Sequence, residues 1–137
     1  MNYFNTFIEI AADCRAEQGA APKARDGSKT IAELEFELIS RTPYRYTQED
    51  VQFHVHCKRT GVTDEQLRAS GAALRKAFFA KPTACMRASP LAKTYGWGLH
   101  FDDRGRVALV SAGTPAYRKL AKDPGVEHTR AMRSKRA

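Results

Sequence analysis

The chain has 137 residues, of which 42% are hydrophobic and 28% charged, and this ordinary globular composition excludes a fibrous or intrinsically disordered protein. The formal net charge at pH 7 is +8. Residues 1–60 hold eight Lys and Arg against nine Asp and Glu, whereas residues 61–137 hold fifteen against six, so the second half favours an anionic partner.

The first predicted element is a strand at residues 4–11. Ile8 and Phe7 fall on opposite faces of this strand, so we expect both faces to be partly covered. Residues 13–28 contain two glycines and a proline without apolar periodicity. This segment is therefore predicted to be a long loop.

A helix is predicted to begin after Thr30, because Thr30 and Glu33 have the spacing of a capping box. Its apolar residues recur at helical spacing, at Ile31, Leu34 and Leu38. Glu33 and Glu37 lie one turn apart and are expected on an exposed, acidic face. The helix is predicted to end at Pro43.

A half-buried strand is predicted at residues 51–58, because apolar and polar residues alternate there. The apolar members are Val51, Phe53, Val55 and Cys57. On such a strand His54 and His56 would project from the same face.

A second helix is predicted to begin after Thr63, which forms a capping-box pattern with Gln66. It is expected to bury one stripe and to expose a basic face. The predicted inward stripe is Leu67, Gly71, Leu74 and Phe78. Pro82 is predicted to end this helix.

The C-terminal third is predicted to contain a loop with at most one helical turn after Pro90, then a β-hairpin over residues 96–111 whose turn includes Gly105. A short last helix is predicted at residues 115–122, with Thr114 as its N-cap. A basic tail follows at residues 126–137, and Met132 is expected to anchor it.

These elements predict an α+β fold with a small sheet of about four strands, an antiparallel C-terminal hairpin and three helices. The predicted order is β-α-β-α-β-β-α. We expect one globular domain over residues 1–125, followed by the basic C-terminal tail at residues 126–137.

Several short motifs distributed over the chain suggest a relative. They are Asn5-Thr6-Phe7-Ile8, Pro43-Tyr44-Arg45-Tyr46-Thr47-Gln48-Glu49-Asp50-Val51, Cys85-Met86-Arg87-Ala88-Ser89-Pro90-Leu91, Tyr95-Gly96-Trp97-Gly98 and Ala131-Met132-Arg133-Ser134. With these motifs the chain resembles a family of small bacterial proteins known only as a domain of unknown function. The resemblance spans essentially the whole chain and implies a single-domain bacterial protein, but it brings no activity, cofactor or catalytic residue.

A dense group of chemically versatile residues lies between positions 85 and 100. Its members are Cys85, Arg87, Ser89, Lys93, Tyr95, Trp97 and His100. The candidate ligand-binding residues are Arg87, Ser89, Lys93, Tyr95, Trp97 and His100, which would form a non-covalent anion or ligand pocket. A packed loop without a ligand is the other possibility that the pattern leaves open.

An enzyme is the alternative hypothesis. Cys85 would be the nucleophile in a cation-rich loop, Arg87 would clamp an anion, and His100 or His56 would serve as acid and base. Position 91, where a phosphatase loop needs Arg, is Leu. Ser89 lacks the glycines of a nucleophile elbow.

No metal site and no cofactor are predicted, since His54 and His56 lack a third ligand at a suitable spacing. Tyr44 and Tyr46 beside Arg45, with Tyr95 and Trp97, offer stacking surfaces next to positive charge, so nucleic acid is a candidate partner. No recognised nucleic-acid-binding motif accompanies them.

The cellular setting predicted from the sequence is the cytoplasm. Cys14, Cys57 and Cys85 are odd in number and far apart, which indicates a reducing compartment. No signal peptide and no apolar run of about 20 residues is apparent, so no membrane association is expected. The function predicted is therefore a cytoplasmic, non-enzymatic binding or accessory protein whose basic half contacts an anionic partner. This partner could be a nucleic acid, a phosphate-bearing ligand or an acidic protein. A homodimer, with the acidic first helix docked on the basic second helix, is a further hypothesis.

Overall fold

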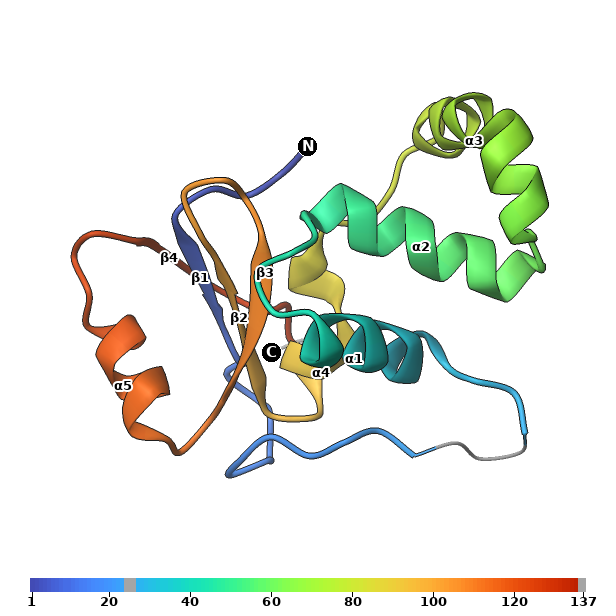
Figure 1. Ribbon diagram of the computed structural model, residues 1–137. Coiled ribbons are helices and arrows are strands. Elements are labelled where there is room, and N and C mark those ends of the chain that lie inside the picture. Colours follow the sequence, from blue (N-terminus) through green and yellow to red (C-terminus); the bar gives the residue numbers. More distant parts are fainter. Residues whose placement is uncertain (24–26, 136–137) are drawn as a thin grey trace.

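One four-stranded sheet organises the computed structural model, which describes residues 1–23 and 27–135 (Figure 1). The strands are β1 (Thr6–Glu9), β2 (Trp97–Phe101), β3 (Val107–Ser111) and β4 (Glu127–Arg130). Their spatial order is β3-β2-β1-β4, with β1 antiparallel to β2 and parallel to β4. The predicted α+β class is confirmed.

The helices of the described residues cover both faces of this sheet. They are α1 (Ile31–Arg41), α2 (Gln48–Thr60), α3 (Asp64–Phe79), the 3-10 turn η1 (Met86–Ala88), α4 (Pro90–Lys93) and α5 (Pro115–Ala121). α1 and α4 lie against one face, α2 packs on α1, and α5 lies against the other face (Figure 1). Within the described chain, none of these helices has the length and apolarity needed to cross a bilayer.

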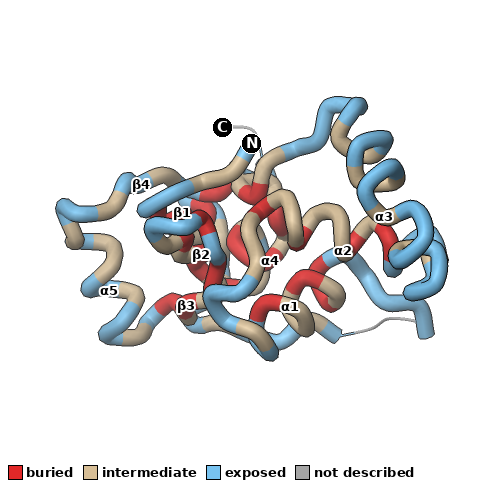
Figure 2. The backbone as a smooth tube through the Cα atoms, turned by 45° about the horizontal axis from the view of Figure 1, so that its top comes forward, coloured by how far each residue is buried: buried red, intermediate tan, exposed pale blue. Residues whose placement is uncertain are grey.

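The main core lies between the sheet and the α1, α2 and α4 helices, where the buried residues concentrate (Figure 2). Ile8, Leu99 and Phe101 of the sheet are fully buried there, together with Leu91 of α4. Phe7 is buried on the opposite face, where its ring meets that of Tyr117 in α5 at a centroid distance of 5.0 Å. The expectation that both faces of the first strand are covered is confirmed.

The β2–β3 hairpin agrees with its prediction. Gly105 has a φ of 78°, a left-handed conformation that glycine adopts without strain. The Asp102 carboxylate accepts hydrogen bonds from the backbone N–H groups of Arg104 and Arg106, both at 2.9 Å. The turn is thus held by its own side chain, which explains why a local pattern was enough to predict it.

The strand predicted at residues 51–58 is wrong, because these residues belong to α2. The Thr47 hydroxyl accepts the N–H of Asp50, and the Asp50 carboxylate accepts the N–H of Thr47 at 3.0 Å. Val51 and Val55 are four residues apart and face the main core, whereas Phe53 contacts Phe78 of α3. The helix is therefore apolar on two sides, and this distribution imitates the alternation of a strand.

α3 begins at its predicted N-cap, where the Thr63 hydroxyl accepts the N–H of Gln66. The residues of its predicted inward stripe are only half-buried, and no residue of α3 is fully covered. The helix stands away from the sheet, and it is kinked at Ser70, where φ is −139° and ψ is 16° (Figures 1 and 2). Phe78 makes its main contact with α2.

The expected exposed face of α1 is also different. The capping box of Thr30 and Glu33 is present, but the Glu33 side chain that completes it is only 8% exposed. Glu35, two residues later, is 6% exposed. The acidic surface that the homodimer hypothesis would use on this helix is therefore smaller than expected.

Residues 127–130, which belong to the predicted basic tail, form β4 beside β1. None of these four residues is apolar, so no hydrophobic pattern marks the strand, whose partners are the backbone groups on the open edge of β1. Ala131 is 4% exposed, whereas Met132, the expected anchor, is 50% exposed. The Asp13 carboxylate accepts the N–H groups of Ser134 and Lys135, both at 3.0 Å.

Candidate functional site

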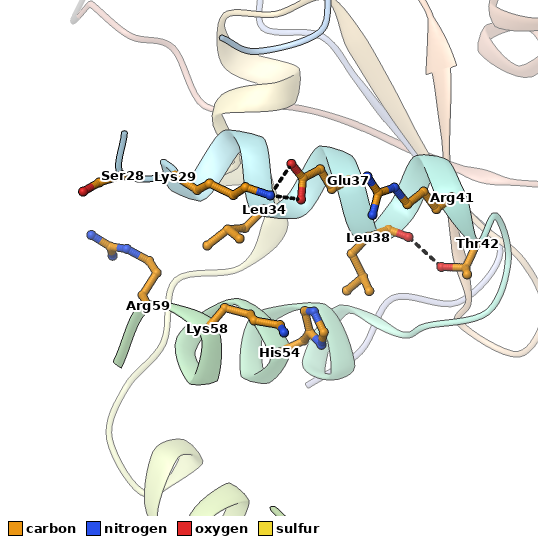
Figure 3. A pocket seen from close by; sticks show the side chains of 10 residues that line it. All are labelled: Ser28, Lys29, Leu34, Glu37, Leu38, Arg41, Thr42, His54, Lys58 and Arg59. Carbon is orange, nitrogen blue, oxygen red and sulfur yellow. Dashed lines mark hydrogen bonds and ion pairs between the residues drawn. The ribbon is translucent and has the colours of Figure 1, made fainter. Parts of the chain in front are cut away.

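A groove with a volume of about 830 Å³ lies between α1 and α2 (Figure 3). Its lining comes from α1, α2 and the residues flanking α1: Ser28, Lys29, Leu34, Glu37, Leu38, Arg41, Thr42, His54, Lys58 and Arg59. Leu34 and Leu38 point from α1 into the space above α2 and form its apolar base. The polar ends of the longer side chains surround this base.

Positive charge dominates the groove. Lys29 donates to both oxygens of the Glu37 carboxylate at 2.8 Å, and the Lys29 hydrogen bond is the main reason why the pKa of Glu37 lies below its ordinary value. Arg41, Lys58 and Arg59 form no ion pair with any described residue. Four cations therefore line the groove against one carboxylate, which is already engaged.

His54 adds a polar but uncharged group to the groove. Burial lowers the pKa of its imidazole below the ordinary value, and the nearby Lys58 ammonium lowers it further. The ring is consequently neutral at pH 7 and offers one N–H donor and one acceptor. The groove can thus provide both charge and a directional hydrogen bond to an anion.

A second cavity, with a volume of about 560 Å³, lies between α1, α2, α3 and the segment that leads into α4. Apolar side chains make up much of its lining, among them Ile31, Val55, Phe78, Met86 and Pro90. Glu35 and Ser89 also line it, and the Ser89 hydroxyl donates to Oε1 of Glu35 at 2.7 Å. Burial raises the pKa of Glu35 to about 7, although the Ser89 hydrogen bond acts in the opposite direction.

A family model described as "Family of unknown function (DUF6157)" matches residues 1–137, the whole chain. The chain belongs to this family. Among curated proteins and solved structures, none matches it significantly. The resemblance to a domain of unknown function is thereby confirmed.

Of the residues singled out between positions 85 and 100, Cys85 and Ser89 line the second cavity, and His56 lines it with them. The Cys85 sulfur accepts a hydrogen bond from the Tyr3 hydroxyl at 3.2 Å. Arg87 lines neither cavity, and its Nε–H donates to the carbonyl of Arg130 at 2.7 Å.

The remaining members of that group lie elsewhere. Lys93 lines a shallow hollow beside the C-terminal segment, with Ser134 and Lys135. The Trp97 ring lies 5.6 Å from that of Phe36, and its indole N–H donates to the carbonyl of Ala20 at 2.9 Å. Trp97 therefore anchors the loop before α1.

Tyr95 is partly buried against the main core and lines neither cavity. His100 alternates along β2 with Leu99 and Phe101, which belong to that core, so it projects from the opposite face of the sheet. Its Nδ1 is 2.7 Å from the Tyr44 hydroxyl oxygen. The seven residues thus do not form one pocket, and the sheet separates His100 from the cavity that Cys85 lines.

His54 and His56 do not face the same way, because they lie on a helix. Residues two apart on a helix are separated by about 200° around its axis. His54 lines the α1–α2 groove, and the ring of His56 stacks on Phe78 at a centroid distance of 4.4 Å. Within residues 1–23 and 27–135, no three His, Cys, Asp or Glu side chains are placed to hold a metal ion.

Sequence reasoning missed Glu35 and the α1–α2 groove. Glu35 lies four residues after Ile31 and four before Ile39, and this helical spacing was the available sign that it shares their face. His54 and Lys58 have the same spacing on α2. The strand predicted at residues 51–58 concealed that second relationship.

Proposed function

We propose that this protein binds a small phosphate-bearing ligand in the groove between α1 and α2. The observation that supports this function is the excess of cations in the groove, where Lys29, Arg41, Lys58 and Arg59 stand against Glu37 alone. The proposed ligand is an anion, as the net charge of +8 leads us to expect. The proposed contact is not the group of residues between positions 85 and 100 but a groove lined by residues between positions 28 and 59.

Phosphate is the favoured ligand chemistry because the groove combines guanidinium and ammonium groups. A guanidinium donates two parallel hydrogen bonds to a phosphate, and an ammonium adds a mobile point charge. The two arginines and Lys58 reach the groove from two different helices (Figure 3). A ligand between the helices would therefore neutralise charges that otherwise repel one another.

Binding is preferred to catalysis because of the state of the other titratable groups in the groove. Glu37 is held as a carboxylate by Lys29, and His54 has a lowered pKa. The Glu37 carboxylate is therefore occupied by Lys29, and the neutral imidazole of His54 can donate a hydrogen bond to an anion. A cytoplasmic binding or accessory protein remains the functional class that we propose.

The test is a calorimetric titration with pyrophosphate at low salt. We expect the wild type to bind and the double variant Arg41→Gln/Lys58→Gln to lose at least about tenfold in affinity, since each charged hydrogen bond contributes about 1.5–3 kcal/mol. The matched control is Lys119→Gln/Lys122→Gln, which removes the same charge at α5, on the other side of the sheet. It should bind within about twofold of the wild type, because screening weakens distant charges.

Two results would contradict the proposed function. Absence of pyrophosphate binding at about 50 mM salt is one, since electrostatic binding is strongest there. Equal loss of affinity in both double variants is the other, because net charge rather than the groove would then be responsible. Cations in the last turns of α1 and α2 also stabilise these helices, so the thermal stability of each variant should be measured alongside binding.

A further inference from the structure

The second cavity contains a buried ionisable group that no described residue joins in an ion pair. Glu35 is 6% exposed, and the hydrogen bond that its side chain accepts comes from the neutral hydroxyl of Ser89. Among the described residues it belongs to no ion pair. Removing a carboxylate from water without a charged partner costs several kcal/mol.

Packing alone does not require a carboxyl group at this position. Glu35 shares a helix face with Ile31 and Ile39, and Ile39 is fully buried in the main core. An apolar side chain there would avoid the cost of burying a charge. A costly buried ionisable group in a cavity is characteristic of functional sites.

The cavity has the size and lining of a small-molecule site. Its volume of about 560 Å³ falls in the range of about 300–1,000 Å³ that ligand pockets occupy. Apolar walls come from α1, α2, α3 and η1, and polar side chains such as Gln52 and Thr60 lie beside them. One such group is held in place: the Ser89 hydroxyl bonds Oε1 of Glu35 while accepting the N–H of Leu91 at 3.2 Å.

We infer that this cavity binds a small apolar amine, with its protonated nitrogen on the Glu35 carboxylate and its apolar body against Val55, Phe78 and Met86. The ammonium group would supply the missing counter-charge and donate a charge-assisted hydrogen bond to the carboxylate. Ser89 acts as a positioning residue, because it fixes the orientation of the carboxyl group that receives the ligand.

The other titratable groups of the cavity do not replace the amine. Arg59 of α2 also lines it, but among the described residues it forms no ion pair with Glu35. His56 stacks on Phe78 and forms part of the wall. Cys85, which directly precedes η1, accepts its hydrogen bond from the Tyr3 hydroxyl. None of these groups gives Glu35 a cationic partner.

The test compares three probes of similar shape by NMR titration of the full chain at about pH 8, where Glu35 is ionised. The probes are 2-phenylethylamine, 2-phenylethanol and 3-phenylpropionate. We expect the amine to bind at residues lining the second cavity, the alcohol to bind at least about tenfold more weakly, and the carboxylate not to bind there. Amine affinity should rise from about pH 5 to about pH 8, because Glu35 must lose its proton to pair with the ammonium.

The variant Glu35→Gln should weaken amine binding at least about tenfold and leave alcohol binding unchanged. Glu127→Gln, which removes an exposed carboxylate from β4, should bind the amine like the wild type. Equal binding of amine and alcohol by the wild type would overturn the inference, as would amine binding that Glu35→Gln does not weaken. If the variant fails to fold, the comparison of the three probes on the wild type and the pH profile of amine binding still test the inference. Neither depends on the α1–α2 groove, so failure of the phosphate proposal leaves this test intact.

Discussion

Glu35 lies inside the fold with its carboxyl group 2.7 Å from the Ser89 hydroxyl, and burial raises its pKa from 4.5 to about 7. The folded protein therefore retains the Glu35 proton at pH values where the unfolded chain has released it. The protonated Glu35 makes its full contribution to the free energy of unfolding below pH 4.5. This contribution is lost as the pH rises through about 7. With about 1.4 kcal/mol per pKa unit, the total loss is about 3 kcal/mol.

The substitution Glu35→Gln should remove this pH-dependent loss, because glutamine keeps an acceptor for Ser89 and has no charge. We expect the variant to exceed the wild type in free energy of unfolding by about 2–3 kcal/mol at about pH 8, and to match it at about pH 4. Denaturant unfolding of both proteins at the two pH values measures the difference. A difference that does not change with pH would show that Glu35 has no raised pKa.

Cys57 and Cys85 should differ in reactivity. Cys57 is 4% exposed on α2, and burial raises the pKa of its thiol, so little reactive thiolate is available. Cys85 is partly exposed at the edge of the second cavity. We expect an alkylating reagent to modify Cys85 at least about tenfold faster than Cys57 in the native protein, as followed by peptide mapping over time. Equal rates would mean that the loop around Cys85 is closed.

At the scale of elements, α2 shows how local and tertiary signals compete. Its N-terminal cap at Thr47 is a local feature, whereas its two apolar sides reflect two different neighbours, α1 with the main core and α3. The alternating apolar residues of α2 therefore pack against two different neighbours. The strand prediction therefore failed at the point where a helix is packed on two sides.

The helical assignment of α2 predicts that its N-cap stabilises the protein. Thr47→Ala removes the hydroxyl that accepts the N–H of Asp50 and should lower the free energy of unfolding by about 1 kcal/mol. The matched control is Thr60→Ala at the other end of the same helix, where the exposed hydroxyl donates to the carbonyl of His56. This control should change stability by less than about 0.5 kcal/mol. Equal effects would argue against the capping role.

α3 illustrates a different limit. Its cap and its helical period were sufficient to predict the helix, but not how little of it is buried. Phe78 meets Phe53 and His56 near the C-terminal end, while Arg75 pairs with Asp50 at 3.0 Å. These contacts all face α2, and no residue of α3 enters the main core. An amphipathic period specifies which side is apolar, but not which neighbour covers it.

At the scale of the whole molecule, the proposed phosphate-binding groove draws none of its lining residues from the basic second half of the chain. The proposed phosphate-binding groove lies within residues 28–59, a part of the sequence with almost balanced charge. Its net positive character comes from cations at the ends of two adjacent helices, with Glu33 and Glu35 buried elsewhere. The net charge of a sequence segment therefore does not predict the charge around a groove. Only the arrangement of charges around the groove determines which ligand can bind there.

The sequence by itself determined the features that depend on neighbouring residues. These include the capped starts of α1, α3 and α5, the β2–β3 hairpin around Gly105, and the α+β class. In each case the groups that stabilise the element lie within a few residues of it, as Thr114 does for α5. Such contacts can be inferred from spacing alone.

Only the tertiary structure decided the features whose stabilising groups come from distant parts of the chain. β4 exists because the backbone edge of β1 pairs with it, and α2 is a helix with two packed sides. Glu35 meets Ser89 across 54 positions of sequence, and Arg41 shares a groove with Lys58 because two helices pack together. Both candidate sites therefore depend on long-range contacts, which no local pattern of residues specifies.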